Sequence, residues 1–159
     1  MTMIHKHIHL KRSVLVYALY IIHFSALMGM YLGYVQWFLS KTWAILFLIF
    51  LFLVDSLPQK NIKKLWPIPT IFFIGFLAEW LGVKFGFLFG DYSYGANLGI
   101  KIDDVPIIIG INWIILSLAT RGIIERFFEL PVMKILVSSV LMVSLDILIE
   151  PLAPRLDYW

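Results

Sequence analysis

Three carboxylates stand inside hydrophobic stretches of this sequence, where a charged group is costly. Glu79 lies in the apolar segment PIPTIFFIGFLAEWLGVKF, and Asp146 and Glu150 lie four residues apart in a later one. Ionisable residues within membrane spans are rare, face the bundle interior and often mark substrate or proton sites. A carboxylic acid can deliver a proton in a reaction, and a second carboxylate can accept one. These three residues are therefore candidates for general acid and base catalysis.

Other chemical patterns in the sequence are weak. His5, His7 and His9 alternate in the N-terminal tail, but one run of imidazoles rarely makes a functional metal site. The four histidines of the chain are too few for a membrane di-iron oxygenase, which needs ligands on several helices. No GxGxxG, phosphate-loop, GxSxG or HExxH motif occurs, and there is no cysteine. We therefore expect side-chain chemistry with no cofactor and no metal.

The composition predicts an integral membrane protein. Hydrophobic residues make up 61% of the 159 residues and charged residues 14%, and the mean hydropathy is +0.90. Five apolar runs are each long enough, or nearly so, to cross a hydrocarbon layer of about 30 Å. We therefore expect an all-α bundle in the cell membrane, formed by a single transmembrane domain over residues 1–159. Its expected spans are at about 14–39, 43–57, 67–89, 105–121 and 132–150.

The basic residues predict how this bundle is oriented. The net charge is +3, but the 13 Lys and Arg residues lie at the ends of spans rather than in one patch, so we expect no nucleic-acid partner. Most of them fall on the same side of the membrane as the N-terminus. The positive-inside rule therefore places the N-terminus inside and the C-terminus outside. Lys84, near the outer end of the third span, either reaches the outer surface or neutralises a carboxylate.

Helix geometry brings the carboxylates into one layer. At 1.5 Å per residue, Glu79 lies about 20 Å along the third span and Asp146 about 21 Å along the fifth, with Glu150 one turn higher. Asn112 lies about 10 Å below the outer surface in the fourth span. All four therefore share the outer half of the membrane. A stripe of small residues on the face of Glu79 should admit a close neighbouring helix: Gly75, Gly82, Gly86 and Gly90.

Three stretches resemble a known family. They are AEWLGVKFGFLFGDYSYGANLG (78–99), VPIIIGINW (105–113) and DILIEPLAPRLDYW (146–159). Together they resemble the carotenoid biosynthesis family of membrane hydratases, whose members add water across the terminal double bond of an acyclic carotenoid end. The resemblance marks these motif positions: Glu79, Gly82, Gly86, Gly90, Tyr92, Tyr94, Pro106, Asn112, Trp113, Asp146, Glu150 and Pro151.

The resemblance implies cofactor-independent hydration, and the residues suggest how it would proceed. Asp146 or Glu79 would deliver a proton to the alkene, and the other of the two, or Glu150, would activate the water. Aromatic faces would shield the resulting carbocation. The carotenoid is expected to enter from the lipid bilayer. The expected substrate-binding residues are Trp80, Tyr92, Tyr94, Asn112 and Trp113.

Alternative functions use the same carboxylates differently. A carotenoid end cyclase-like isomerase would let an alkene attack the cation in place of water. A non-enzymatic membrane assembly or carotenoid-binding subunit would use the acids to hold helices together. The spacing of Asp146 and Glu150 also resembles a metal-diphosphate motif of intramembrane prenyltransferases, but a second acidic motif is missing. The glycine stripe is compatible with a homo-oligomer.

Overall fold

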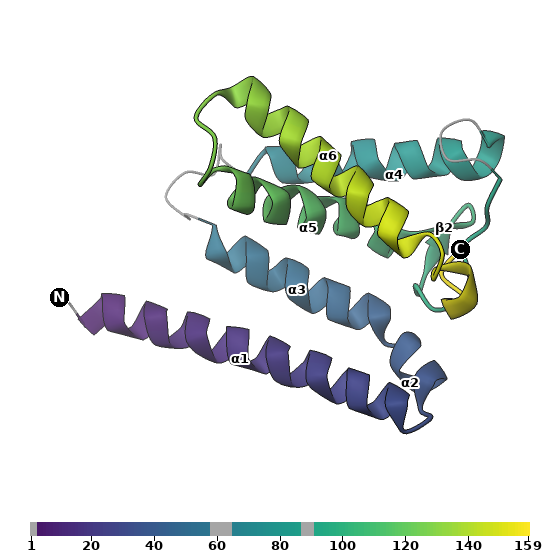
Figure 1. Ribbon diagram of the computed structural model, residues 1–159, viewed down its shortest axis with the longest axis horizontal. Coiled ribbons are helices and arrows are strands. Elements are labelled where there is room, and N and C mark those ends of the chain that lie inside the picture. Colours follow the sequence, from purple (N-terminus) through teal and green to yellow (C-terminus); the bar gives the residue numbers. More distant parts are fainter. Residues whose placement is uncertain (1–2, 58–64, 87–90) are drawn as a thin grey trace.

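The computed structural model is a helical bundle with one short β-hairpin (Figure 1). It describes residues 3–57, 65–86 and 91–159, with side chains from Ser13 onward. The start of α1 and the C-terminus lie at opposite ends of the bundle, and the hairpin lies at the C-terminal end. The elements are α1 (Met3–Tyr31), α2 (Val35–Leu39), α3 (Thr42–Ser56), α4 (Pro67–Phe85), β1 (Lys101–Ile102), β2 (Val105–Pro106), α5 (Ile107–Ile124), α6 (Pro131–Ile149) and the 3₁₀ turn η2 (Pro154–Leu156).

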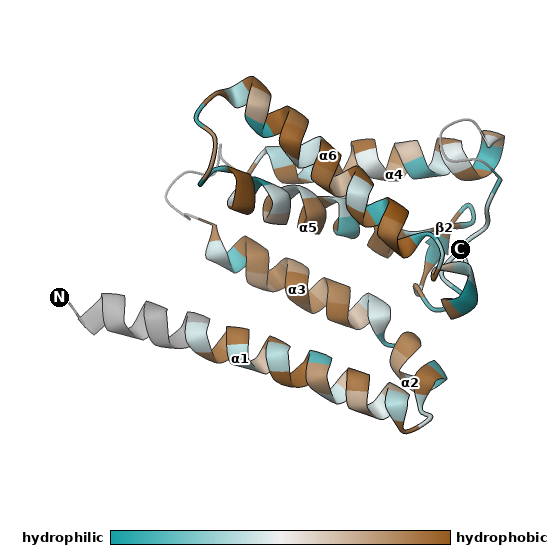
Figure 2. Cartoon of the chain, in the orientation of Figure 1, coloured by the Kyte–Doolittle hydropathy of each residue, from teal (hydrophilic) through white to brown (hydrophobic). Residues whose placement is uncertain are grey.

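This chain is an all-α membrane protein, as its composition predicts. Within the described residues, four helices are long and apolar enough to cross a membrane: α4, α5, α6 and the Ser13–Tyr31 part of α1. Helix α3 is also apolar but has 15 residues. Large hydrophobic side chains are exposed along α1 and α6, where lipid would cover them. Figure 2 shows mostly hydrophobic colours on the helices and hydrophilic ones around the C-terminus.

The first expected span, 14–39, is divided in the structure. Gly33 adopts a left-handed backbone with φ of 96°, which ends α1. The N–H of Tyr34 bonds to the carbonyl of Gly29 and that of Gly33 to the carbonyl of Met30, the hydrogen-bond pattern of a glycine C-cap. The short helix α2 then turns the chain toward α3. The hydrophobic run alone did not predict this break because both halves are equally apolar.

The expected third span, 67–89, ends earlier, and the loop after it contains a hairpin. Gly86, with φ of 61°, caps α4, and its N–H bonds to Gly82 at 2.9 Å. Gly90, the last member of the expected glycine stripe, lies outside the described residues. Strands β1 and β2 pair antiparallel around Asp103 and Asp104, whose φ angles of 49° and 71° match a two-residue hairpin turn.

Helix α5 is the centre of the bundle and contacts α3, α4 and α6. Helix α5 packs against α4 at two glycines, one in each helix, and each glycine contacts an aromatic ring of the opposite helix. A Cβ atom at Gly75 would overlap Trp113, and one at Gly110 would overlap Phe72. Close packing at these glycines sets the distance between the two helices. Trp113 is thereby carried against the face of α4 that also bears Glu79.

Candidate active site

The Glu79 carboxylate is the centre of a polar cluster at the C-terminal end of α4. It is half-buried and accepts three hydrogen bonds. Its Oε1 atom accepts from Trp113 Nε1 at 3.0 Å. Its Oε2 atom accepts from the hydroxyls of Tyr92 at 2.8 Å and Tyr94 at 2.6 Å. The structure therefore brings together the acid and three of the aromatic residues that the sequence singles out.

Two different parts of the chain position these donors. Trp113 reaches Glu79 from α5 because its ring packs over Gly75, one helical turn before the acid. Tyr92 and Tyr94 come from the loop between α4 and β1, and their rings meet edge to face with centroids 5.4 Å apart. Alternate residues of an extended segment normally point the same way, which puts both hydroxyls on Glu79. The loop thus covers the carboxylate.

The two tyrosines sit in a hydrophobic and negatively charged environment. Burial, followed by the charge and the hydrogen bond of Glu79, raises the pKa of the Tyr94 phenol well above its ordinary value of 10.0. Burial and the hydrogen bond to Glu79 also raise the pKa of the Tyr92 phenol, and the charge of Asp146 adds to that rise. Both phenols therefore stay protonated and remain donors to Glu79 at neutral pH.

Asp146 lies close enough to this cluster for its charge to act on Tyr92. It is on an exposed part of α6, and its side chain makes no hydrogen bond within the described residues. Glu150 follows one turn later at the C-cap of α6, also exposed, and its charge interacts with that of Asp146. No hydrogen bond among the described side chains joins Asp146 to the cluster, and Glu150 lies one turn farther along α6.

Two of the expected substrate-binding residues are not part of the hydrogen-bonded cluster. Asn112 precedes Trp113 by one residue and so lies about 100° around α5 from it. The side-chain amide of Asn112 has no hydrogen-bond partner among the described residues. Trp80 follows Glu79 directly, yet its Nε1 donates to Asp103 Oδ2 of the hairpin at 2.6 Å. Trp80 therefore joins α4 to the hairpin.

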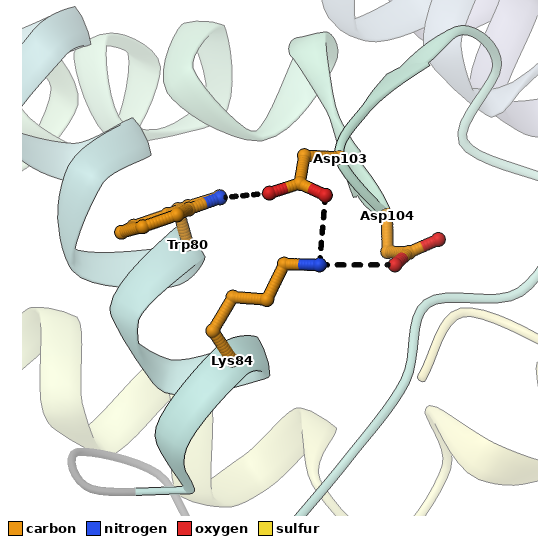
Figure 3. Close-up of polar contacts among 4 residues, drawn as sticks. All are labelled: Trp80, Lys84, Asp103 and Asp104. Carbon is orange, nitrogen blue, oxygen red and sulfur yellow. Dashed lines mark hydrogen bonds and ion pairs between the residues drawn. The ribbon is translucent and has the colours of Figure 1, made fainter.

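Lys84 completes this link between α4 and the hairpin (Figure 3). Its Nζ atom lies 2.7 Å from Asp103 Oδ1 and 3.4 Å from Asp104 Oδ2. Of the two alternatives for Lys84, the structure shows the neutralisation of carboxylates. The bonds from Lys84 and then from Trp80 hold the pKa of Asp103 below its ordinary value of 3.8. The hairpin is thus tied to the helix that carries Glu79.

Residues at the end of the third motif also contact the site, although they were not predicted as site residues. Ring centroids of Trp159 and Tyr94 are 6.4 Å apart, so Trp159 extends the aromatic group around Glu79. Asp157 and Tyr158 bind the loop that carries the tyrosines. The sequence feature that could have indicated these residues is the polar and aromatic run LDYW, which follows Pro151 within the same motif.

Within the described side chains, no group of three or more His, Cys, Asp or Glu residues is arranged to hold a metal ion. The side chains of His5, His7 and His9 lie outside that part. His23, in α1, has its Nδ1 atom 2.8 Å from the carbonyl of Leu19.

Comparison with known proteins gives one match. A family model described as "carotenoid biosynthesis protein" matches residues 16–159, a range that contains every residue of the cluster. No curated protein and no solved structure matched the chain.

Proposed function

The chain belongs to the carotenoid biosynthesis protein family, and from that premise we propose that it hydrates the terminal double bond of an acyclic carotenoid. The observation that carries this proposal is the Glu79 carboxylate, held by three donors with Asp146 nearby on a helix open to lipid. Hydration of an alkene needs one group that gives a proton and another that takes one. Two adjacent carboxyls can supply both.

The reaction would proceed in three steps. The protonated carboxyl of Asp146 gives its proton to the terminal alkene, whose π electrons form the new C–H bond and leave a tertiary carbocation. The oxygen of a water molecule then forms a C–O bond to that cation, and one proton of the water passes to Glu79. Return of this proton from Glu79 to Asp146 restores both groups. The sum is the addition of one water molecule to the double bond.

Hydrogen bonding is the reason for this division of roles. A carboxylate offers about four acceptor positions, and Glu79 uses three of them. Among the described residues Oε1 bonds only to Trp113, so its remaining position can accept a hydrogen bond from the reacting water. The side chain of Asp146 has no hydrogen-bond partner within the described residues and is exposed on α6. Its oxygens are therefore accessible to a substrate that arrives from the bilayer.

The aromatic rings around Glu79 would protect the cation. A cation over an aromatic face gains about 0.5 to 2 kcal/mol, the larger value when water is excluded. Tyr92, Tyr94 and Trp113 already direct their polar atoms at Glu79, so three aromatic rings surround the carboxylate. Trp159 adds a fourth ring against Tyr94. Trp80 supports the hairpin in this proposal and does not contact the cation.

Pigment analysis in a host that makes an acyclic carotene tests this function. We expect the wild-type protein to produce a carotenoid heavier by one water, with its new oxygen taken from labelled water. Glu79→Gln and Asp146→Asn should each lower product formation by about 100-fold or more, the usual contribution of a general acid or base. Glu125→Gln is the matched control, because Glu125 forms an exposed ion pair with Arg121 at the far end of α5.

Four other outcomes of the pigment analysis would contradict the proposed hydration, and each would indicate a different function or role. A product of unchanged mass would indicate cyclisation in place of hydration. Oxygen taken from labelled oxygen gas would indicate an oxygenase. Pigment that co-purifies unmodified, with no turnover, would indicate a carotenoid-binding subunit. Full activity of both carboxyl variants would show that Glu79 and Asp146 do not handle protons.

A further inference from the structure

We propose that residues 153–159 form a clasp that fixes the tyrosine loop, residues 91–98, on Glu79, and that Asp157 is its positioning residue. The catalytic consequence rests on the proposed hydration, whereas the clasp itself can be tested without any activity. Asp157 would act through the loop and would not touch the substrate.

Three consecutive loop residues bond to three consecutive clasp residues in the opposite order. The N–H of Gly95 donates to the carbonyl of Tyr158 at 3.0 Å. The N–H of Ala96 donates to the Asp157 carboxylate at 3.0 Å. The Asn97 amide donates to the carbonyl of Leu156, also at 3.0 Å. Such a continuous set fixes both the position and the register of the loop.

The fit between loop and clasp is too close to be a casual surface contact. A Cβ atom at Gly95 would overlap the backbone oxygen and the carboxylate of Asp157. Asn97 is buried, with 7% of its surface exposed, and Ala153 is completely buried. Loss of the partner of a buried amide costs about 1 to 3 kcal/mol, so Asn97 resists separation from Leu156. The loop and clasp therefore form one packed unit.

Both ends of the clasp are attached to the bundle. At its start, the N–H of Ala153 bonds to the carbonyl of Ile149 in α6 at 3.0 Å, and near its end the hydroxyl of Tyr158 lies 2.8 Å from Thr42 Oγ1 at the start of α3. The ring of Trp159 packs edge to face against Tyr94. The clasp thereby connects the end of α6, which carries Asp146, to α3 and to the loop.

The position of the clasp determines where the tyrosine hydroxyls lie. Tyr94 immediately precedes Gly95, and its hydroxyl bonds to Glu79 at 2.6 Å. A shift of about 1 Å would weaken or break such a bond, and misplacement of that size can cost about 100-fold in rate. Release of the clasp should therefore disturb Glu79 although no clasp residue bonds to it.

Substitutions at Asp157 separate its carboxylate from its backbone conformation. Asp157 has φ of 54°, a left-handed conformation that Asn and Gly adopt readily. Asp157→Asn keeps an acceptor for the Ala96 N–H, whereas Asp157→Gly removes it without backbone strain. We expect Asp157→Gly to lower hydration by about tenfold or more, and Asp157→Asn to retain most of the activity.

The rate of thiol labelling measures how exposed an introduced cysteine in the loop is, because the chain has no cysteine of its own. Leu98 is 4% exposed, so Leu98→Cys should label slowly in an otherwise unchanged protein and several-fold faster with Asp157→Gly. Ile100→Cys, at a position already 79% exposed, is the control and should label at one rate in both backgrounds. If Asp157→Gly does not accumulate in membranes, Tyr158→Phe removes only the hydroxyl contact to Thr42 and should give a smaller acceleration.

The two measurements distinguish failure of the clasp from failure of the proposed function. A wild-type protein that forms no hydrated product refutes the hydration, while Leu98→Cys labelling still tests the clasp. Labelling that Asp157→Gly does not accelerate refutes the clasp. So does full hydration by Asp157→Gly under conditions where Glu79→Gln has lost it.

Discussion

At the scale of single residues, the structure shows how a carboxylate is accommodated in an apolar helix. Glu79 is bound by three donors, and a hydrogen bond to a charged group contributes about 1.5 to 3 kcal/mol. The sequence predicted that aromatic residues surround it but could not separate Trp80 from Trp113. Trp80 is adjacent in sequence yet bonds to Asp103, whereas Trp113 arrives from another helix. Only the packing of α4 on α5 decides between them.

The raised pKa values of the tyrosines predict how stability depends on pH. Burial and Glu79 raise the pKa of Tyr94, so its stabilising contribution is complete below pH 10, the ordinary phenol value. Above that pH the unfolded chain loses the phenol proton first. Stability should therefore fall by up to about 1.4 kcal/mol per pH unit for this group. Thermal unfolding of the purified protein in detergent, measured at a series of pH values, checks this.

A pair of phenylalanine variants isolates the effect. Tyr94→Phe should lower stability at neutral pH, because a donor to Glu79 is lost, and should flatten the decline above pH 10. Tyr31→Phe removes a phenol that is 86% exposed and should leave the pH profile as it is. An identical decline in wild type and Tyr94→Phe would show that Tyr94 is not held protonated by the site.

At the scale of elements, the α4 and α5 pair positions the acid and one of its donors. Each helix provides a glycine at the point where the other provides an aromatic ring. At Gly75 the obstacle is Trp113 near its backbone, which cannot rotate away without moving Nε1 from Glu79. At Gly110 the obstacle is the outer edge of the Phe72 ring, which can shift. The two contacts should therefore tolerate a methyl group differently.

Alanine substitutions at three glycines test this difference. Gly75→Ala should destabilise the protein by about 1 to 3 kcal/mol and abolish most activity, because overpacking displaces Trp113. Gly110→Ala should cost less in both respects. Gly122→Ala, in the same helix with open space around it, should be neutral or stabilising by up to about 1 kcal/mol. Equal melting temperatures and activities for all three variants would show that the contacts at Gly75 and Gly110 do not set the packing of α4 on α5.

At the scale of the whole molecule, composition was sufficient for the membrane class, while the grouping of Glu79 with Asp146 by helix periodicity stays a prediction. Breaks in the helices were harder to predict, because a left-handed residue such as Gly33 leaves hydropathy unchanged. The clasp was not predicted either, because its contacts join segments about sixty residues apart, and each of its three bonds uses at least one backbone group, which every residue carries. Patterns of residue type identify chemistry and burial, while backbone pairing between distant loops depends on the assembled bundle.

The orientation of the bundle remains the prediction on which the water supply depends. The structure puts the tyrosine loop, the hairpin and the clasp at one end, and the start of α1 at the other (Figure 1). The positive-inside rule places the end with α1, together with Arg121, Arg126 and Lys134, in the cytoplasm. The Glu79 site would then lie toward the outer surface. Water for hydration would reach it from that side through the loop.

Single cysteines in this cysteine-free chain test the orientation. Ser93→Cys lies in the tyrosine loop and Glu129→Cys in the link between α5 and α6, and both positions are exposed. A thiol reagent that cannot cross membranes should label Ser93→Cys in intact cells and Glu129→Cys only after permeabilisation. The unsubstituted chain, which should not label, is the control. The reverse pattern would place the site at the cytoplasmic face, and the distribution of Lys and Arg would then not have determined the insertion.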